Sequence, residues 1–164
     1  MKPKRRPQLT LEWTLSDRLI EILTGIMLTA LIAIPLYFYD RLPDLIPIHF
    51  NLFGEVDGYG SKQMIWLWPA LGLAIYGGLG WMNKRPHNFN YLVPITDKNA
   101  RVQYTISTQM TRTLRLILIT LFVLISWSMV KSDQLYLIKQ LTPILFLSIF
   151  VLIAYSQYRS FKNK

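Results

Sequence analysis

The chain has 164 residues, of which 52% are hydrophobic and only 16% are charged, against about 25% charged residues in a typical soluble domain. It contains no cysteine, which excludes disulfides, thiol catalysis and thiolate metal sites. The formal net charge is +9, a value that membrane topology explains better than nucleic-acid binding does. No linker divides the sequence, so residues 1–164 are expected to form a single membrane domain.

Four uncharged apolar runs predict an all-α membrane protein with four transmembrane helices. A bilayer core of about 30 Å needs roughly 20 helical residues. The expected helices cover residues 19–39, 63–83, 114–131 and 138–158. The third run is short, and we expect Arg115 and Lys131 to snorkel outward from its ends. The uncharged runs themselves, residues 22–39, 63–83, 116–130 and 140–158, contain no charged side chain, so a coupled transporter is disfavoured.

Basic residues give the orientation of these helices. The two tails and the segment between the second and third runs hold 14 of the 18 lysines and arginines. Positive residues stay on the cytoplasmic side, so both termini are predicted to be cytoplasmic and the loop between the first two helices extracytoplasmic. The basic tail lacks aromatic interleaving, and no nucleic-acid partner is predicted. A cleaved signal peptide is disfavoured for the first run, because no small-x-small cleavage site follows it.

The start of the chain contains the acidic residue that comes closest to the membrane interior. Residues 9–21 are expected to form a short interfacial helix, with Ser16 as a candidate cap of the transmembrane helix. Glu21 is expected to pair with Arg18 on the same helix, three residues earlier. A proton or ion site at Glu21 is the alternative interpretation.

Small residues and prolines mark positions inside the runs. Ala70, Ala74 and Gly78 recur at four-residue spacing, a pattern typical of a helix-packing face in lipid. This face is also compatible with a homo-oligomer or with a subunit of a larger membrane complex. Pro35 and Pro143 lie inside the first and fourth runs, and each is expected to kink its helix.

The segment between the second and third runs contains more than a connector. Thr96 is a candidate N-cap, and the helix after it carries Val102, Ile106 and Met110 in a narrow apolar stripe. This helix is expected to lie against the membrane or the other helices and to run into the third one. Candidate functional residues on this inner side are His87, Asn90, Thr96 and Asn99.

Residues 41–62, "RLPDLIPIHFNLFGEVDGYGSK", are the main candidate for a site. Pro43 and Pro47 disfavour helix and favour extended backbone, and the glycines that follow favour turns. The segment is therefore expected to form an ordered cap over the outer helix ends. The candidate ligand-binding residues are His49, Asn51, Glu55, Asp57 and Lys62.

A metal site in this loop is a further interpretation, and the sequence leaves it unresolved. One histidine with nearby carboxylates can hold zinc or manganese. The second histidine, His87, is predicted on the opposite side of the membrane, and no HExxH or calcium-loop motif is present. No Gly-x-Ser-x-Gly motif points to hydrolysis either, and no cofactor is predicted.

The same stretch resembles a small membrane domain of unknown function found at the N-terminus of SdpI-type immunity proteins. The matching positions are Leu42, Pro43, Ile46, Pro47, His49, Phe50, Asn51, Gly54, Asp57 and Lys62. A second stretch, "FNYLVPITDKNARVQY", looks like the segment after the second helix of small relatives, so the resemblance covers about residues 20–110. It implies a multi-pass protein of the bacterial cytoplasmic membrane. It also implies immunity to a secreted peptide, or signalling through a protein partner at the membrane.

Three hypotheses follow from these observations. The first is a non-enzymatic membrane protein of the SdpI-associated type, whose outer loop recognises a peptide, a lipid headgroup or a small ligand. The second is a metal-dependent membrane enzyme that acts at the outer surface through His49, Glu55 and Asp57. The third is a structural subunit of a membrane complex.

Overall fold

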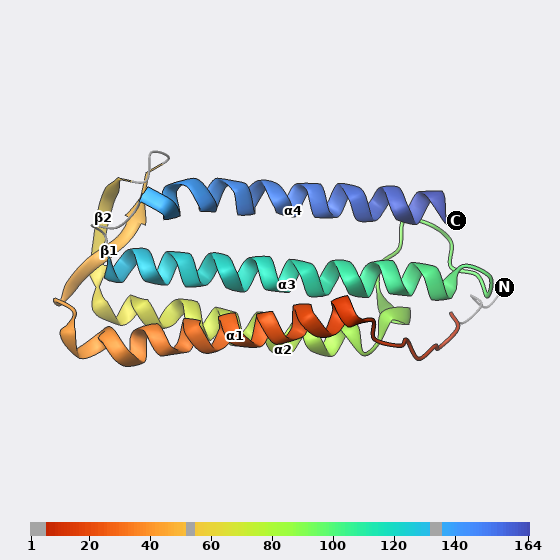
Figure 1. Ribbon diagram of the computed structural model, residues 1–164, viewed down its shortest axis with the longest axis horizontal. Coiled ribbons are helices and arrows are strands. Elements are labelled where there is room, and N and C mark those ends of the chain that lie inside the picture. Colours follow the sequence, from red (N-terminus) through yellow and green to blue (C-terminus); the bar gives the residue numbers. More distant parts are fainter. Residues whose placement is uncertain (1–5, 52–54, 132–135) are drawn as a thin grey trace.

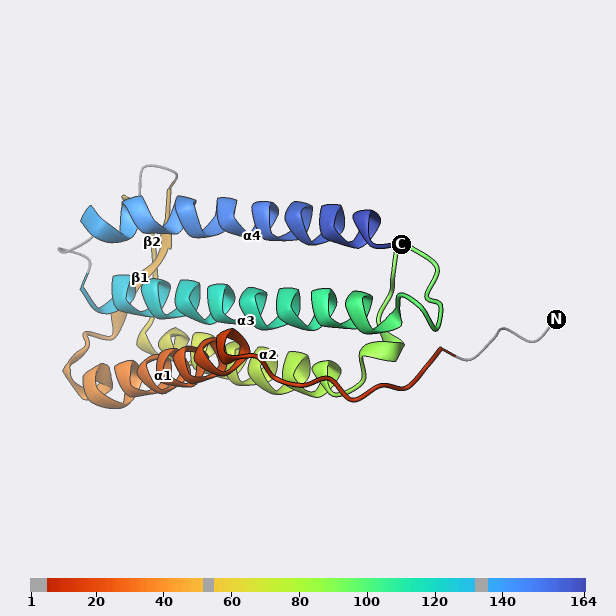
Figure 2. The ribbon, with the colours of Figure 1, turned by 45° about the vertical axis from the view of Figure 1, so that its right-hand side comes forward.

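Four long helices and a short β-hairpin make up the described part of the chain, which comprises residues 6–51, 55–131 and 136–164 of a computed structural model. The helices lie side by side (Figure 1, Figure 2). They are α1 (Leu15–Phe38), α2 (Leu67–Asn83), α3 (Ala100–Val130) and α4 (Tyr136–Lys162), with short 3-10 turns at Tyr39–Arg41, Lys62–Trp66 and Pro86–Asn88. Helix α3 contacts each of the other three helices, and it therefore forms the centre of the bundle.

The hairpin corrects the prediction of an all-α chain. Strands β1 (Leu45–Phe50) and β2 (Val56–Ser61) pair antiparallel between α1 and α2. Extended backbone was expected here from Pro43 and Pro47, but the pairing of the two strands was not. Pro47 is tolerated because a two-stranded sheet consists of edge strands only.

All four helices are long and apolar enough to cross a membrane, which supports the prediction of a multi-pass membrane protein. Helices α1, α3 and α4 begin before their predicted spans, most of all α3, whose 31 residues reach about 46 Å at 1.5 Å per residue. Helix α2 begins four residues after its predicted start, because residues 62–66 form a 3-10 turn. The N-terminal turns of α3 are polar. They were not included in the predicted span because hydropathy detects only the apolar part of a helix. The predicted interfacial helix is wrong for residues 9–14, which are not helical.

Local capping explains where α1 and α3 begin. Thr14, rather than the predicted Ser16, caps α1 in a capping box with Asp17. Thr96 Oγ1 accepts a hydrogen bond from the Asn99 N–H, and the Asn99 side chain accepts one from the Thr96 N–H. This reciprocal pair closes a turn just before α3, whose N-cap is Asn99 rather than the predicted Thr96.

The two ends of the bundle differ. The hairpin lies at one end, and the C-terminus lies at the other end, together with the start of α1 and the segment between α2 and α3 (Figure 1). This arrangement agrees with the alternation expected from the basic residues. The assignment of each end to a side of the membrane remains a prediction.

A small hydrophobic core joins the hairpin to the helices. Ile46 of β1 is 1% exposed and packs with Ile34 of α1, Ile65 before α2 and Met129 of α3. The neighbouring Leu45 points away from this core and is 64% exposed. Isolated two-stranded hairpins are at best marginally stable, so this single inward side chain fixes the hairpin on the bundle.

Packing between α1 and α2 uses a different glycine from the expected ones. A Cβ atom on Gly72 would lie 2.5 Å from Leu31 Cδ2, so only glycine permits this approach. The predicted packing face of Ala70, Ala74 and Gly78 is exposed and makes no such contact within the chain. Pro35 and Pro143 both lie inside helices, as their runs predicted.

We predict that Ile46→Ala lowers the free energy of unfolding by about 2–4 kcal/mol, because it opens a cavity in the core under the hairpin. Leu45→Ala, on the exposed face of the same strand, should change it by less than about 0.5 kcal/mol. Thermal or denaturant unfolding of the purified protein in detergent measures both. Equal losses for the two variants would show that the hairpin is not anchored through Ile46.

Candidate functional site

The hairpin brings two of the predicted site residues together. His49 Nδ1 lies 2.5 Å from Asp57 Oδ1, and the two side chains are 71% and 42% exposed. His49 pairs with Gly58 in the sheet, and the register shifts between His49 and Phe50. Because of this irregularity, Asp57 lies beside His49 rather than on the opposite face of the strand.

Gly58 is needed for this arrangement. A Cβ atom at Gly58 would lie 2.9 Å from His49 Cβ, closer than side chains pack, so a larger residue would push the two strands apart. A Cβ atom at the neighbouring Gly60 would meet Ile48 Cδ1, the end of a side chain that can move aside, so the restriction there is weaker. The glycines that the sequence suggested as turn residues therefore act in the strand, as positions of close approach.

The remaining outer residues form separate local pairs. Asn51 donates a hydrogen bond to Glu55 Oε2 at 2.9 Å, and the Glu55 N–H donates to Asn51 Oδ1 at 3.0 Å. Lys62 Nζ lies 3.2 Å from the carboxylate of Asp44. Glu55 therefore does not join His49 and Asp57 in one donor set. Within the described ranges, no group of three His, Asp or Glu side chains is placed to hold a metal ion.

The inner candidate residues lie at the opposite end of the bundle, where several of them have structural roles. The backbone carbonyl of His87 accepts a hydrogen bond from Arg6 at 3.0 Å, and Asn99 belongs to the cap with Thr96. Asn90 is exposed. Because the two histidines lie at different ends, a two-histidine metal site is not formed within the chain.

The N-terminal segment crosses this end of the bundle as a strap, here meaning residues 6–14. Arg6 donates hydrogen bonds to the carbonyl groups of His87 and Phe89, and the Tyr104 hydroxyl donates to the carbonyl of Pro7. The Arg6 guanidinium also lies 5.4 Å from the ring centre of Tyr91, where burial raises the pKa of the Tyr91 hydroxyl to about 12. These contacts hold the strap against α3 and the segment before it.

Beneath the strap lies a buried ionic cluster that the sequence analysis missed. Arg112 Nη1 contacts Asp17 Oδ1 at 2.9 Å, and its Nε lies 3.5 Å from Glu21. Arg115 forms an ion pair with the same Glu21 carboxylate and donates to the carbonyl of Tyr76 at 3.1 Å. The side chains of Arg112 and Arg115 are only 7% and 3% exposed. The cluster therefore joins α1 and α2 to α3.

Two sequence-based expectations are corrected by this cluster. Glu21 pairs with the arginines of α3 rather than with Arg18, which is exposed. Arg115 points into the bundle instead of snorkelling outward. The Arg115 guanidinium contacts the Glu21 carboxylate and the Tyr76 carbonyl, and it lies 4.6 Å from the centre of the Tyr76 ring. Because these partners replace water, moving the side chain outward would gain little free energy. The signal was present in the sequence, because Asp17 and Glu21 share one helix face through their four-residue spacing.

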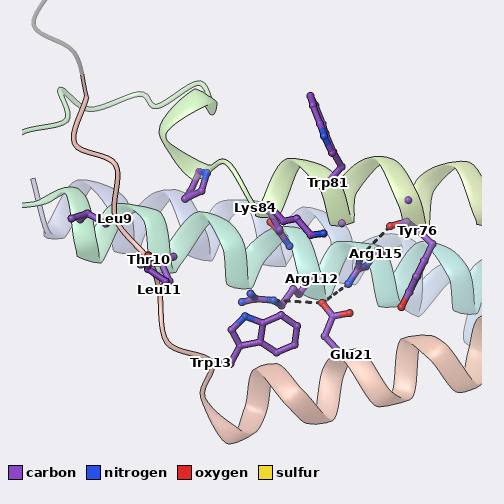
Figure 3. Close-up of a pocket in the computed structure, with 14 residues that line it drawn as sticks. Leu9, Thr10, Leu11, Trp13, Glu21, Tyr76, Trp81, Lys84, Arg112 and Arg115 are labelled. Atoms are coloured by element: carbon purple, nitrogen blue, oxygen red, sulfur yellow. Dashed lines mark hydrogen bonds and ion pairs between the residues drawn. The ribbon is translucent and has the colours of Figure 1, made fainter.

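A cavity of about 630 Å³ opens beside the cluster. Strap residues, the end of α2 and the arginines of α3 surround it (Figure 3). Its lining residues are Leu9, Thr10, Leu11, Trp13, Glu21, Tyr76, Gly77, Gly80, Trp81, Asn83, Lys84, Pro86, Arg112 and Arg115. A Cβ atom at Gly80 would lie 2.7 Å from Arg115 Nη1, so glycine at this position allows the guanidinium to reach its partners.

Helix lengths give the depth that the cluster would have if α1 and α3 cross a membrane. About 20 helical residues cross the core. Counting that number back from Val130 reaches the neighbourhood of Arg112 on α3, and the same count back from Phe38 reaches the neighbourhood of Asp17–Glu21 on α1. With Val130 and Phe38 at one boundary of the core, the cluster would lie near the other, beside the lipid headgroups.

Comparison with known proteins identifies one part of the chain. A family model described as a domain of unknown function (DUF1648) matches residues 26–73, under a third of the sequence. These residues include most of α1, the hairpin and the first part of α2. No curated protein and no solved structure matches the chain.

We predict that Arg115→Met and Glu21→Gln each lower the free energy of unfolding by about 3–5 kcal/mol, because each leaves a buried charge without its partner. The double variant should recover part of this loss. Arg18→Gln, one turn earlier on an exposed face, is the control and should stay within about 0.5 kcal/mol. Strictly additive losses in the double variant would show that the two groups do not interact.

Proposed function

We propose that this chain is a non-enzymatic, multi-pass membrane protein whose hairpin, residues 45–61, recognises a peptide or small ligand outside the cell. The observation that carries the proposal is the His49–Asp57 pair, which is exposed although its hairpin is fixed to the bundle through Ile46. Exposed ion pairs contribute little to stability, about 0–1 kcal/mol. A pair in this position is therefore better suited to recognition than to folding.

The surroundings of the pair favour a ligand with both polar and apolar groups. Leu45 and Tyr59 are both 64% exposed on the hairpin, and Ile48 is 36% exposed. An imidazole next to a carboxylate can donate and accept hydrogen bonds, while the aliphatic and aromatic side chains add apolar contact. A peptide supplies both kinds of group.

The biological role that we propose is SdpI-associated immunity or signalling. The first stretch that carries the resemblance to SdpI-type proteins, from Leu42 to Lys62, falls inside the segment matched by the family model, whereas the second, residues 89–104, lies outside it. In this proposal the hairpin faces the outside of the bacterial cytoplasmic membrane. It meets a secreted peptide there, and the basic inner side contacts a membrane-protein partner.

We predict that His49→Ala and Asp57→Ala abolish protection of a sensitive bacterial strain that expresses the full chain and is challenged with secreted toxic peptides. Loss of either side chain removes the polar contact while the helices stay intact. Survival at increasing peptide concentration is the measurement, and membrane insertion of each variant is checked by fractionation.

The matched control is Asp44→Ala, which removes an exposed carboxylate from the same segment without touching the pair. It should protect as well as the wild type. If both hairpin variants protect normally, the pair is only structural. If the wild-type chain gives no protection, the immunity role is wrong.

A second candidate function is assembly into a larger membrane complex. The specific observation is that Ala70, Ala74 and Gly78 form an exposed small-residue face on α2, while packing within the chain uses Gly72. Such faces allow close helix contact in lipid. Crosslinking in native membranes would identify a second copy or another subunit, and a monomer alone would count against this function.

A further inference from the structure

We infer that the cavity between the strap, α1, α2 and α3 binds the phosphate group of an anionic phospholipid. This inference concerns the end of the bundle opposite the hairpin, and it does not depend on the proposed recognition function. The volume of the cavity, about 630 Å³, lies within the range of small-ligand sites, about 300–1,000 Å³. Four independent features of the lining point to this ligand.

The first feature is the balance of charge. Three cationic side chains line the cavity, Lys84, Arg112 and Arg115, against one carboxylate, that of Glu21. The carboxylate of Asp17 partly neutralises the charge of Arg112, but Asp17 does not line the cavity. The lining is therefore positive on balance, and it favours an anion.

The second feature is a set of polar atoms that lack protein partners. Among the described residues, both side-chain atoms of Asn83 are buried and make no hydrogen bond. Arg115 keeps a buried Nε–H without a hydrogen-bond acceptor, whereas Arg112 Nε makes no hydrogen bond but lies 3.5 Å from Glu21. Unsatisfied buried groups of this kind are rare, and two lining residues, Asn83 and Arg115, share the property here. A phosphate group brings further acceptor oxygens, in addition to the protein acceptors that the guanidinium groups already use.

The third feature is the apolar and aromatic rim. Trp13 and Trp81 line the cavity and are 51% and 57% exposed; Trp13 lies beside Arg112, and Trp81 projects outward from α2 (Figure 3). Leu9 and Leu11 of the strap add aliphatic surface. Tryptophan side chains favour the headgroup level of a bilayer, and they would contact the glycerol and upper acyl region of a bound lipid.

The fourth feature is depth. With Phe38 and Val130 at one boundary of the bilayer core, the lengths of α1 and α3 would put the cluster near the other boundary. Basic pockets between transmembrane helices at this level bind anionic headgroups. A free phosphate ion shares the charge but gains nothing from the aromatic rim, so the lipid is the expected source of the phosphate.

The two adjacent glycines of α2 provide a test that leaves every charge in place. Gly77 lines the cavity and Gly78 does not, and a Cβ atom on either one meets no heavy atom within 4 Å. Gly77→Leu therefore fills the cavity, whereas Gly78→Leu adds the same side chain next to it. Both changes replace glycine with a good helix former, so neither should unfold α2.

The experiment titrates the delipidated full-length protein in detergent with phosphatidylglycerol or phosphatidylcholine of identical acyl chains. Native mass spectrometry measures the bound lipid. We expect phosphatidylglycerol to bind at least about fivefold more tightly than phosphatidylcholine, which is the contribution of about one basic residue near the headgroup. Gly77→Leu should remove this binding, and Gly78→Leu should keep it.

A second pair of variants tests the charge at the rim. Lys84→Gln should weaken phosphatidylglycerol binding about fivefold. Lys98→Gln, an exposed lysine away from this cavity, should not change it. Equal binding by the Gly77→Leu and Gly78→Leu proteins, or equal binding of the two lipids, would overturn the inference. Displacement of the lipid by inorganic phosphate at the same concentration would assign the cavity to free phosphate and would also overturn it.

Discussion

The structure depends on one constraint, which is that two arginines of the central helix are buried and must be neutralised where they lie. Arg112 and Arg115 cannot leave the interior cheaply, and removing one partner from a buried pair is strongly destabilising. Asp17 and Glu21 supply the opposite charge from one face of α1. This pairing fixes α1 against α3 both in rotation and along the helix axis.

The position of the hairpin follows from this register. Helix α1 leaves the cluster at one end of the bundle and delivers the chain to β1 at the other, where Ile46 enters a core shared with α1 and α3. The two ends of the bundle therefore differ in their side chains. The hairpin end carries the exposed His49–Asp57 pair, and the opposite end encloses the positively charged cavity under the strap. The family match covers the hairpin end, whereas both arginines lie outside it.

Sequence reasoning found the features that are local in the chain. Runs of apolar residues identified the four helices that are long and apolar enough to cross a membrane, and Pro43 and Pro47 indicated the extended backbone of the hairpin. Thr96 marked the turn before α3, but the N-cap lies three residues later, at Asn99. The ionic cluster was missed, since Arg112 and Asp17 are 95 residues apart and several carboxylates were available to each arginine. The His49–Asp57 contact depended likewise on a strand irregularity that no spacing rule indicates.

In the proposed membrane topology, the hairpin and the α2–α3 segment face opposite sides of one membrane, with the hairpin outside. The absence of cysteine makes single-cysteine labelling direct. Tyr59 and Leu92, 64% and 68% exposed, mark the two ends. With a membrane-impermeant thiol reagent on intact cells, Tyr59→Cys should react at once, and Leu92→Cys should react only after permeabilisation. Labelling of both positions from the same side would contradict the account.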